Sequence, residues 1–281
     1  MDKVAVLLPV YAKDNAEWFR LSLDSVLSQK GCRPIVYVGV DGPVGENIRT
    51  VLEHYADRPD VRIHSFPINR GLTAVLNNLI DVAVQSDVEF IARMDADDIS
   101  LPDRFARQVG YLQRHPEVMV IGGSIQEFNA TNDCVNIRHY PETNDEVIKY
   151  ICKASPCAHP ATMIRRAIFD NGISYNENYR TSQDIALWYD VICAGYNIGN
   201  LNDVVLKFRL TDDIFKRRSR AYAKNEFKIY FNGIYRLYGF FSWRYIYPLF
   251  RLIFRLMPVR LIRWFYNSKV RLIILQKNVQ T

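Results

Sequence analysis

Residues 88–102 read VEFIARMDADDISLP, an apolar run that passes directly into a group of acids. The opening VEFIARM is rich in the β-branched and aromatic residues of a buried strand. The DADD that follows, residues 95–98, places three carboxylates within four positions. Such a stretch predicts a central strand that delivers polar groups to one edge of a sheet.

Three similar apolar runs precede this one, and a segment with apolar residues at helical spacing separates each run from the next. The predicted strands are Val4–Val10, Pro34–Val40, Val61–Phe66 and Val88–Met94, and the predicted helices are Asn15–Gln29, Val44–Tyr55 and Thr73–Val84. This βαβαβαβ order predicts an α/β fold with a mainly parallel, doubly wound sheet flanked by helices.

The second half of the chain continues with more widely spaced elements. The predicted helices are Leu101–Arg114, Asn144–Cys152 and Ile185–Ala194, and the predicted strands are Val118–Phe128, His159–Arg165 and Asn197–Arg209, with the rest of residues 129–158 irregular. Ser100 or Asp98 is placed to cap the first of these helices.

Charge is divided unevenly along the chain. The 281 residues include 36 Lys and Arg against 30 Asp and Glu, a net charge of +6. From Lys216 to the end there are 15 basic residues and one acid, Glu226. We therefore predict a mildly acidic domain over residues 1–215 and a strongly basic, aromatic tail over residues 216–281.

Cysteine usage and the N-terminus argue against an exported protein. The five cysteines are scattered and form no CxxC pair, so they predict neither a disulfide framework nor a zinc site. The opening MDKVAVLLPVYAKD lacks the positive leader and cleavage site of a signal peptide. No stretch reaches the about 18 uncharged apolar residues that a membrane span needs. We expect a cytoplasmic protein that is soluble or bound to a membrane surface.

Residues that follow the predicted strands are the first candidates for a binding site, because ligands of open α/β sheets gather beyond the carboxyl ends of the strands. They are Pro9, Val10 and Tyr11 after the first strand, Asp41 after the second, Asn69, Arg70 and Gly71 after the third, and Asp95, Ala96, Asp97 and Asp98 after the fourth.

The acids of residues 95–98 need a compensating cation. Neighbouring carboxylates raise one another's pKa unless a cation or hydrogen-bond donors offset their charge. Mg²⁺ and Mn²⁺ suit oxygen ligands, and they often bind through one or two carboxylates together with substrate phosphates. The cluster therefore predicts a metal site that also holds phosphate, with a solvated turn or a helix cap as the alternative.

Five ordered motifs resemble a known family. LLPVYAKD, VGVDG, NRGLTAVLNN, IARMDADDISLPDRF and HPATMIRR together resemble bacterial family 2 glycosyltransferases of the GT-A fold, in the branch that assembles O-antigens, capsules and exopolysaccharides. The resemblance covers about residues 3–210. It implies a nucleotide-sugar-binding half over residues 1–100 and an acceptor-binding half over residues 101–215.

The activity that the resemblance implies is metal-dependent, inverting sugar transfer. The donor would be a UDP-sugar, and a hexose or N-acetylhexosamine would pass to a polyprenyl-diphosphate-linked saccharide with Mn²⁺ or Mg²⁺ as cofactor. Two other readings stay open from the residues alone. A nucleotidyltransferase would be expected to carry a glycine-rich loop where this chain has PVYAKDNAEW. A non-catalytic membrane-bound sugar-binding protein would not need its acids intact.

The resemblance assigns the strand-end residues to the donor. The implied contacts are Pro9, Val10 and Tyr11 in the nucleotide pocket, Asp41 on the uracil edge, Asn69, Arg70 and Gly71 in the turn beside the nucleotide, and Asp95 with Ala96 near the ribose and donor sugar. Asp97 would hold the metal that bridges the diphosphate. Asp98 would support that ligand or cap the next helix.

The catalytic base implied by the resemblance is Asp184, in TSQDIALWYDV. Gln183 stands where the family usually has Glu, and an N-cap role is the alternative for Asp184. Gln183 and Trp188 are possible acceptor contacts, and His159 of CAHPATMIRR matches a position near the acceptor.

Arg209, in FRLTDD, matches a family Arg that can reach the diphosphate. Thr211 stands where the family often has a His that contacts the metal or the diphosphate.

The tail suggests contact with a membrane. Residues 240–275 interleave aromatic and aliphatic residues with Arg and Lys, and Pro248 and Pro258 are expected to break them into short helices. Basic amphipathic helices of this kind lie in the interface of anionic bilayers. The family reading places the protein on the inner face of the cytoplasmic membrane, without nucleic acid as a partner. The alternative is a tail that covers apolar surface of its own domain.

Overall fold

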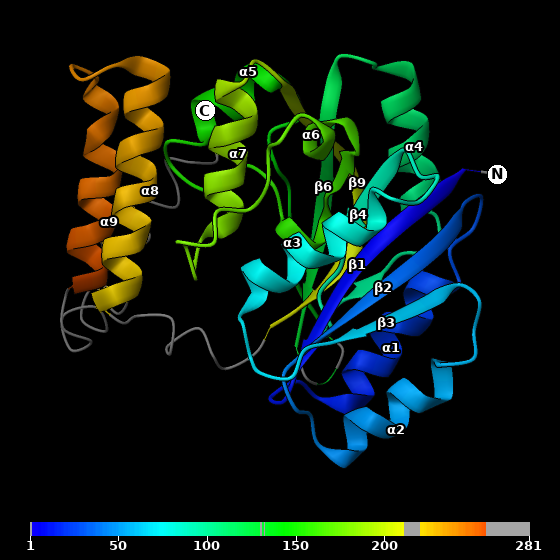
Figure 1. Cartoon of the computed structure of the whole chain (residues 1–281). Coiled ribbons are helices and arrows are strands. Elements are labelled where there is room, and N and C mark those ends of the chain that lie inside the picture. The colour runs from blue at the N-terminus through cyan, green and yellow to red at the C-terminus, as the bar shows by residue number, and fades with distance from the viewer. Residues whose placement is uncertain (1, 130, 132, 211–219, 257–281) are drawn as a thin grey trace. The chain divides into compact units, whose positions relative to one another are not determined.

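The chain separates into two compact units, Met1–Asp212 and Asp213–Thr281. The computed structural model describes residues 2–129, 131, 133–210 and 220–256. The first unit holds one sheet with helices on both faces, and the described part of the second is helical (Figure 1). Thr211 and the part of the tail beyond residue 256 lie outside the described residues.

The strands of the first unit form one sheet in the order β3-β2-β1-β4-β8-β6-β9-β5, with β7 paired to β6. They are β1 Lys3–Tyr11, β2 Arg33–Asp41, β3 Val61–Ser65, β4 Phe90–Arg93, β5 Ile99–Ser100, β6 Val118–Phe128, β7 Cys134–Arg138, β8 Met163–Arg165 and β9 Asn197–Arg209. The predicted parallel pairing of the first four strands is confirmed, since β3, β2, β1 and β4 are parallel neighbours. Beyond β4 the sheet is mixed, because β8 runs antiparallel to both β4 and β6, whereas β6 and β9 are parallel.

The helices of the first unit are α1 Ala16–Leu27, α2 Glu46–Tyr55, α3 Leu72–Ala83, α4 Arg104–Arg114, α5 Asn144–Tyr150, α6 Ala167–Asp170 and α7 Gln183–Cys193, with the 3-10 helix η1 at His159–Ala161. α1 begins where the Asn15 side chain accepts hydrogen bonds from the backbone N–H groups of Glu17 and Trp18. α5 begins with a capping box formed by Thr143 and Glu146.

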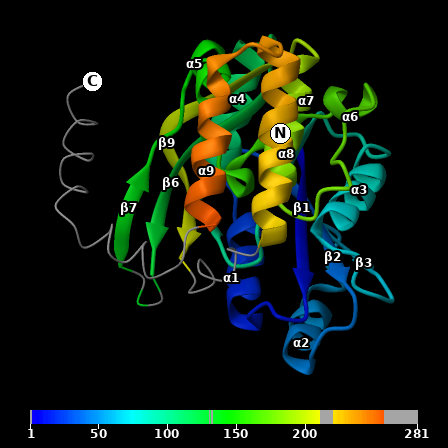
Figure 2. The same cartoon turned by 90° about the vertical axis from the view of Figure 1, so that its left-hand side faces the viewer.

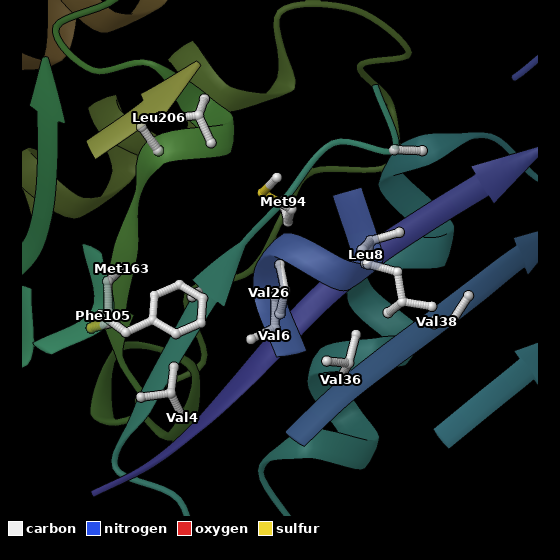
Figure 3. Packing of buried hydrophobic residues seen from close by; sticks show 14 of the residues in the cluster. Val4, Val6, Leu8, Val26, Val36, Val38, Met94, Phe105, Met163 and Leu206 are labelled. Atoms are coloured by element: carbon white, nitrogen blue, oxygen red, sulfur yellow. The ribbon is translucent and has the colours of Figure 1, made fainter. Parts of the chain in front are cut away.

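Alternate residues of each central strand point to opposite faces of the sheet, so each face has its own apolar side chains for helices to pack on. Val4, Val6 and Leu8 of β1 are completely buried in a core that they share with α1, α2 and α4 (Figure 3). α3 packs on the opposite face, where Gly39 of β2 meets Val75 of the helix. The carboxyl ends of the parallel strands are therefore held between helices on both sides.

The start of α4 differs from the prediction. The helix begins at Arg104 with Asp103 at its N-cap position, because residues 99–100 pair with β9 as the short strand β5. Neither predicted cap is used. Ser100 belongs to β5, and Asp98 accepts a hydrogen bond from the backbone N–H of Arg209 at 2.9 Å.

Two other predictions are wrong in part. The segment His159–Arg165 is a strand only from Met163 onward, because Pro160 lies in η1 instead of in a strand. Residues 129–158, predicted to be irregular apart from one helix, also contain β7. All five residues of β7 are exposed, so it lacks the alternation of a half-buried strand.

The described part of the second unit consists of α8 Arg220–Tyr238, the 3-10 helix η3 Trp243–Tyr245 and α9 Ile246–Leu256, and α8 and α9 lie side by side as a hairpin (Figure 2). The predicted break at Pro248 is wrong, because Pro248 lies in the first turn of α9, where the missing N–H group is not needed. Pro258 lies outside the described residues. Among the residues described, none of the helices is both long enough and apolar enough to span a bilayer.

The polar side chains of α9 are directed toward α8. Arg251 and Arg255 both form ion pairs with Glu226 of α8, at N–O distances of 2.7 and 2.5 Å. Apolar side chains are exposed instead, and we call this set the apolar face of the hairpin. It consists of Phe240, Phe241, Trp243, Ile246, Leu249, Phe250, Ile253 and Phe254.

Two glycines should respond in opposite ways to an added methyl group. In Gly39→Ala the new Cβ would overlap Val75 Cγ1 and lie 3.1 Å from Leu79 Cδ1, so we expect a loss of about 1–3 kcal/mol in the free energy of unfolding. In Gly110→Ala, inside α4, the nearest group is the flexible end of Arg114 at 3.4 Å, so we expect a gain of up to about 1 kcal/mol. Urea unfolding of both variants measures the difference. Equal stability would contradict the close packing of α3 on β2.

Candidate functional site

The first polar cluster at the carboxyl edge of the sheet is built around Asp41, the last residue of β2. Its carboxylate accepts hydrogen bonds from Asn69 Nδ2 at 2.9 Å, from the backbone N–H of Arg70 at 2.6 Å and from that of Gly71 at 3.0 Å. Gly71 has a φ of 88°, which a residue with a side chain rarely adopts. The turn before α3 thus brings three predicted site residues, Asn69, Arg70 and Gly71, into contact with a fourth, Asp41.

The end of β1 lies beside this cluster, because Tyr11 of β1 pairs with Asp41 of β2 in the sheet register. The Val10 side chain is buried in the hydrophobic core, so its backbone is the part that can face a ligand. Pro9 is buried as well, whereas Tyr11 is exposed. Of the three predicted pocket residues, Tyr11 alone presents a side chain to solvent.

The second cluster follows β4, on the other side of β1 from the first. Asp95, Asp97 and Asp98 each place a carboxylate oxygen within 4.8 Å of the other two. Ser22 of α1 donates a hydrogen bond from Oγ to the Asp95 carbonyl at 2.7 Å, and Ala96 packs into the core. α1 and the core therefore fix the acidic loop, which confirms that the predicted acids lie together.

Burial limits how much negative charge this cluster holds. Burial, together with the charge of Asp95, raises the pKa of Asp97 to about 6. Burial and its two acidic neighbours raise the pKa of Asp98 well above its usual range, and Asp98 Oδ2 has no hydrogen-bond partner among the described residues. Arg93, only 2% exposed, forms an ion pair with Asp95. Sequence patterns missed Arg93, although it is the last residue of β4 and lies only two residues before Asp95.

These carboxylates fit a divalent metal ion. Asp95 and Asp97 are partly exposed, so their oxygens can reach a cation at the surface of the cluster. Hard oxygen ligands at this spacing suit Mg²⁺ or Mn²⁺. Asp98 is enclosed, and one of its oxygens is taken by the backbone of Arg209. Asp97 is thus available as the predicted ligand, and Asp98 supports the loop from behind.

Arg209 lies directly under this loop. Its Nε donates to the Asp97 carbonyl at 2.8 Å. Its guanidinium lies between two aromatic rings, 4.6 Å from the centroid of Trp18 and 4.4 Å from that of Phe128. Sequence patterns missed both rings, because they come from α1 and β6, far from Arg209 along the chain. The predicted contact between Arg209 and a diphosphate stays a prediction.

Asp14 is a fourth acid near the cluster, and sequence patterns missed it too. Its Oδ2 accepts a hydrogen bond from the backbone N–H of Tyr11 at 2.9 Å. Burial raises the pKa of Asp14 to about 7 against the effect of that hydrogen bond, and the charges of Asp97 and Asp95 add to the rise. The YAKD motif held this signal, since it places an acid just beyond the first strand.

Asp184, the predicted base, is the second residue of α7. The N-cap position of this helix is Ser182, so Asp184 does not cap it. Ser155 Oγ donates a long hydrogen bond of 3.4 Å to Asp184 Oδ2. Burial raises the pKa of Asp184, while backbone N–H groups, Ser155 and the charge of Arg93 oppose the rise. Arg93 therefore acts on both Asp95 and Asp184.

Of the remaining predicted residues, Gln183 and Trp188 share α7 with Asp184, and His159 packs against Trp188. His159 Nε2 and the Tyr175 hydroxyl are 2.6 Å apart in a buried hydrogen bond, and burial holds the pKa of His159 well below its usual range. Trp188 is completely buried and packs edge-on against His159, with ring centroids 6.2 Å apart. Gln183 is also buried. Tyr175 carried no recognisable sequence signal.

Sequence comparison relates the chain to enzymes of polysaccharide synthesis. The model of the family described as Glycosyl transferase family 2 matches residues 5–173. The amylovoran biosynthesis glycosyltransferase AmsE of Erwinia amylovora is 29% identical over 265 residues, which cover 94% of this chain and 98% of that protein. The UDP-Gal:alpha-D-GlcNAc-diphosphoundecaprenol beta-1,3-galactosyltransferase of Escherichia coli is 24% identical over 271 residues, covering 96% of this chain and 97% of that protein.

Solved structures share the fold. S. aureus TarS 1-349 in complex with UDP-GlcNAc matches with a TM-score of 0.59 at 18% identity, covering 91% of this chain and 82% of that one. The mannosyltransferase PcManGT from Pyrobaculum calidifontis in complex with GDP-Man and Mn²⁺ matches with a TM-score of 0.59 at 16% identity, covering 89% and 74%. The predicted GT-A fold is confirmed by this likeness.

Mn²⁺ binding to the acidic cluster should depend on pH. A proton competes with the metal for Asp97, whose pKa is raised to about 6. We expect an Mn²⁺ affinity that is level above about pH 7 and that falls by up to about tenfold per pH unit below about pH 6. Calorimetric titration between pH 5 and 8 measures it. Asp14→Asn should keep the fall near pH 6, and a constant affinity across this range would contradict the role of Asp97.

Proposed function

Because the chain belongs to glycosyl transferase family 2, we propose that it transfers a hexose or N-acetylhexosamine from a UDP-sugar to a polyprenyl-diphosphate-linked saccharide, with inversion at the anomeric carbon. The observation that carries the proposal is the acidic cluster after β4, joined to Asp184 by the charge of Arg93. Relatives named for amylovoran synthesis and for a diphosphoundecaprenol-linked acceptor support the substrate class.

Two clusters would share the donor. The Asp41 turn lies at the end of β2, and the backbone N–H groups of Arg70 and Gly71 hold the Asp41 carboxylate, which would accept a hydrogen bond from the uracil edge. Asp97 would hold the metal, which would stabilise the negative charge that develops on the departing diphosphate, and Asp95 would lie beside the ribose and donor sugar. A neighbour in fold that binds UDP-GlcNAc, and another that binds GDP-Man with Mn²⁺, support a metal-bound nucleotide-sugar here.

Asp184 would take the proton of the acceptor. An acceptor hydroxyl oxygen attacks the anomeric carbon of the donor sugar, and the bond from that carbon to the β-phosphate oxygen breaks. UDP departs with the bonding electrons, and the hydroxyl proton passes to Asp184. A base for this step must be ionised, and Arg93 and the N-terminus of α7 favour the ionised carboxylate. One acid thus binds donor, and another acts on the acceptor.

Separate substitutions should divide these two roles. Asp97→Asn should abolish Mn²⁺-dependent UDP binding, because the metal loses a charged ligand. Asp184→Asn should leave UDP affinity within about twofold and lower the transfer rate by about 10²- to 10⁴-fold, because only the proton acceptor is lost. UDP binding by calorimetry, and transfer from a panel of UDP-sugars with Mn²⁺ to a synthetic lipid-diphosphate sugar, measure the two effects.

Asp103→Asn is the matched control, because Asp103 is an exposed acid whose side chain pairs with Arg107 outside both clusters. Asp103→Asn should change neither the affinity for UDP nor the transfer rate. If Asp97→Asn and Asp184→Asn lost UDP binding and transfer in equal measure, the division of roles would be wrong.

We also propose that the second unit attaches the protein peripherally to an anionic membrane, on the cytoplasmic side where lipid-linked acceptors would be used. The apolar face of the hairpin supports this, since Phe241 is 98% and Phe250 64% exposed. Aromatic side chains of this kind suit the boundary between headgroups and acyl chains. Basic residues in the segment 257–281, such as Arg260 and Arg263, supply positive charge close by in the sequence.

Replacing exposed aromatic residues of the hairpin should weaken membrane binding. Phe241→Asp combined with Phe250→Asp should lower the affinity for phosphatidylglycerol vesicles at least tenfold, because each buried Phe contributes about 2 kcal/mol. Co-sedimentation measures the bound fraction. Val135→Asp, at an exposed apolar position in β7, should bind as the unchanged protein does. Unchanged sedimentation of the double variant, or of a chain lacking residues 240–281, would refute membrane attachment through this unit.

A further inference from the structure

The segment 173–182 connects α6 to α7 and leads into Asp184, and it contains neither helix nor strand. Backbone groups of an irregular segment must find partners other than those of a regular helix or strand. Here α3 supplies several of them. Asn77 Nδ2 donates to the Tyr175 carbonyl at 2.9 Å, and Asn77 Oδ1 accepts from the Tyr175 backbone N–H at 3.1 Å. One amide side chain thus binds both backbone groups of Tyr175, much as a neighbouring strand would.

α3 holds the segment at further points. Thr73 Oγ1 donates to the Tyr179 carbonyl at 3.0 Å, and Asn77 Nδ2 also lies 3.1 Å from Glu177 Oε1. The N-cap residue of the same helix is Gly71, whose backbone N–H donates to the Asp41 carboxylate. Asn77 is six residues further along, about 9 Å at the rise of an α-helix. The helix that starts in the proposed nucleotide turn is therefore also the anchor of the segment before the base.

The other end of the segment is conformationally restricted. Ser182 has a φ of 57°, and no other non-glycine residue of the described chain has a positive φ. Such a conformation persists only where the surroundings enforce it. From Tyr175, a hydrogen bond leads to His159, and His159 packs on Trp188, one turn beyond Asp184 in α7. Tyr175 is therefore connected to α7 both along the segment and through the contacts of its side chain.

We propose that Asn77 is a positioning residue for Asp184: by holding the backbone of Tyr175, it fixes the proposed base relative to the helix that begins at the nucleotide turn. The inference rests on the proposed function, since it takes Asp184 as the base. A base must lie within hydrogen-bond reach of the acceptor hydroxyl, and a displacement of about 1 Å can cost about 10²-fold in rate. α3 thereby links the donor half of the site to the acceptor half.

Substitution of Asn77 tests the proposal in the full-length protein. Asn77→Leu has a similar volume but neither donates nor accepts, and Asn77→Asp keeps an acceptor for the Tyr175 N–H while losing the donor. We expect transfer kcat to fall by about 10- to 100-fold in Asn77→Leu and by at least as much in Asn77→Asp, whose second carboxylate oxygen would face the Tyr175 carbonyl and Glu177 Oε1. The affinity for UDP with Mn²⁺ should stay within about twofold in both. Asn78→Leu, at the adjacent position of α3, is the matched control, because no side-chain hydrogen bond of Asn78 is found in the described residues.

Hydrogen exchange separates positioning from a general loss of structure. Amides of the segment 173–182 should exchange faster in Asn77→Leu, while those of β1, β2 and β4 keep their protection. Wild-type kcat in Asn77→Leu, or an equal loss of UDP affinity and kcat, would overturn the proposal. So would a fall in kcat without faster exchange of the segment. The proposed function fails on a different result, namely full transfer activity in Asp184→Asn.

Discussion

Negative charge gathered at the end of β4 must be balanced, because an unpaired buried charge costs several kcal/mol. Three arginines from three elements do this. Arg93 of β4 pairs with Asp95, Arg209 of β9 binds the same loop, and the charge of Arg104 in α4 acts on Asp98. Arg104 also donates to the carbonyl of Arg93 at 3.0 Å, which ties α4 to β4. The arginines offset the negative charge of the acidic loop, and their contacts with the loop help to hold β4, β9 and α4 in place.

The parallel half of the sheet was predictable because β1, β2 and β4 are buried on both faces and the helices have one apolar stripe each. β1, β2, β3 and α3 all appear within a few residues of their predicted bounds. The mixed half was harder to predict. β7 is exposed throughout, so burial left no mark on its sequence, and β5 exists only because residues 99–100 pair with β9. Which strands pair in this half of the sheet depends on the tertiary fold, and local sequence patterns carry no signal for it.

The same distinction holds for the site. Asp41 and Asp95 could be identified because each directly follows an apolar strand, and the topology of a parallel sheet brings strand ends together. Arg93, Trp18 and Asn77 could not, because their importance comes from neighbours far along the chain. Asn77, for instance, is separated from Tyr175 by 98 residues, and an Asn within a helix has no distinctive pattern. Chemistry at strand ends was therefore visible in the sequence, whereas the groups that orient it were not.

The ion pairs inside the hairpin change what kind of adhesion α9 can provide. Because Arg251 and Arg255 both pair with Glu226, one of their two positive charges is offset within the hairpin, and the exposed side of the helix is apolar. Dissolved salt screens attraction between exposed charges beyond about 8 Å at physiological ionic strength, but it does not weaken contact between apolar surfaces. The proposed adhesion through α9 would thus depend less on salt than that of a purely basic arm.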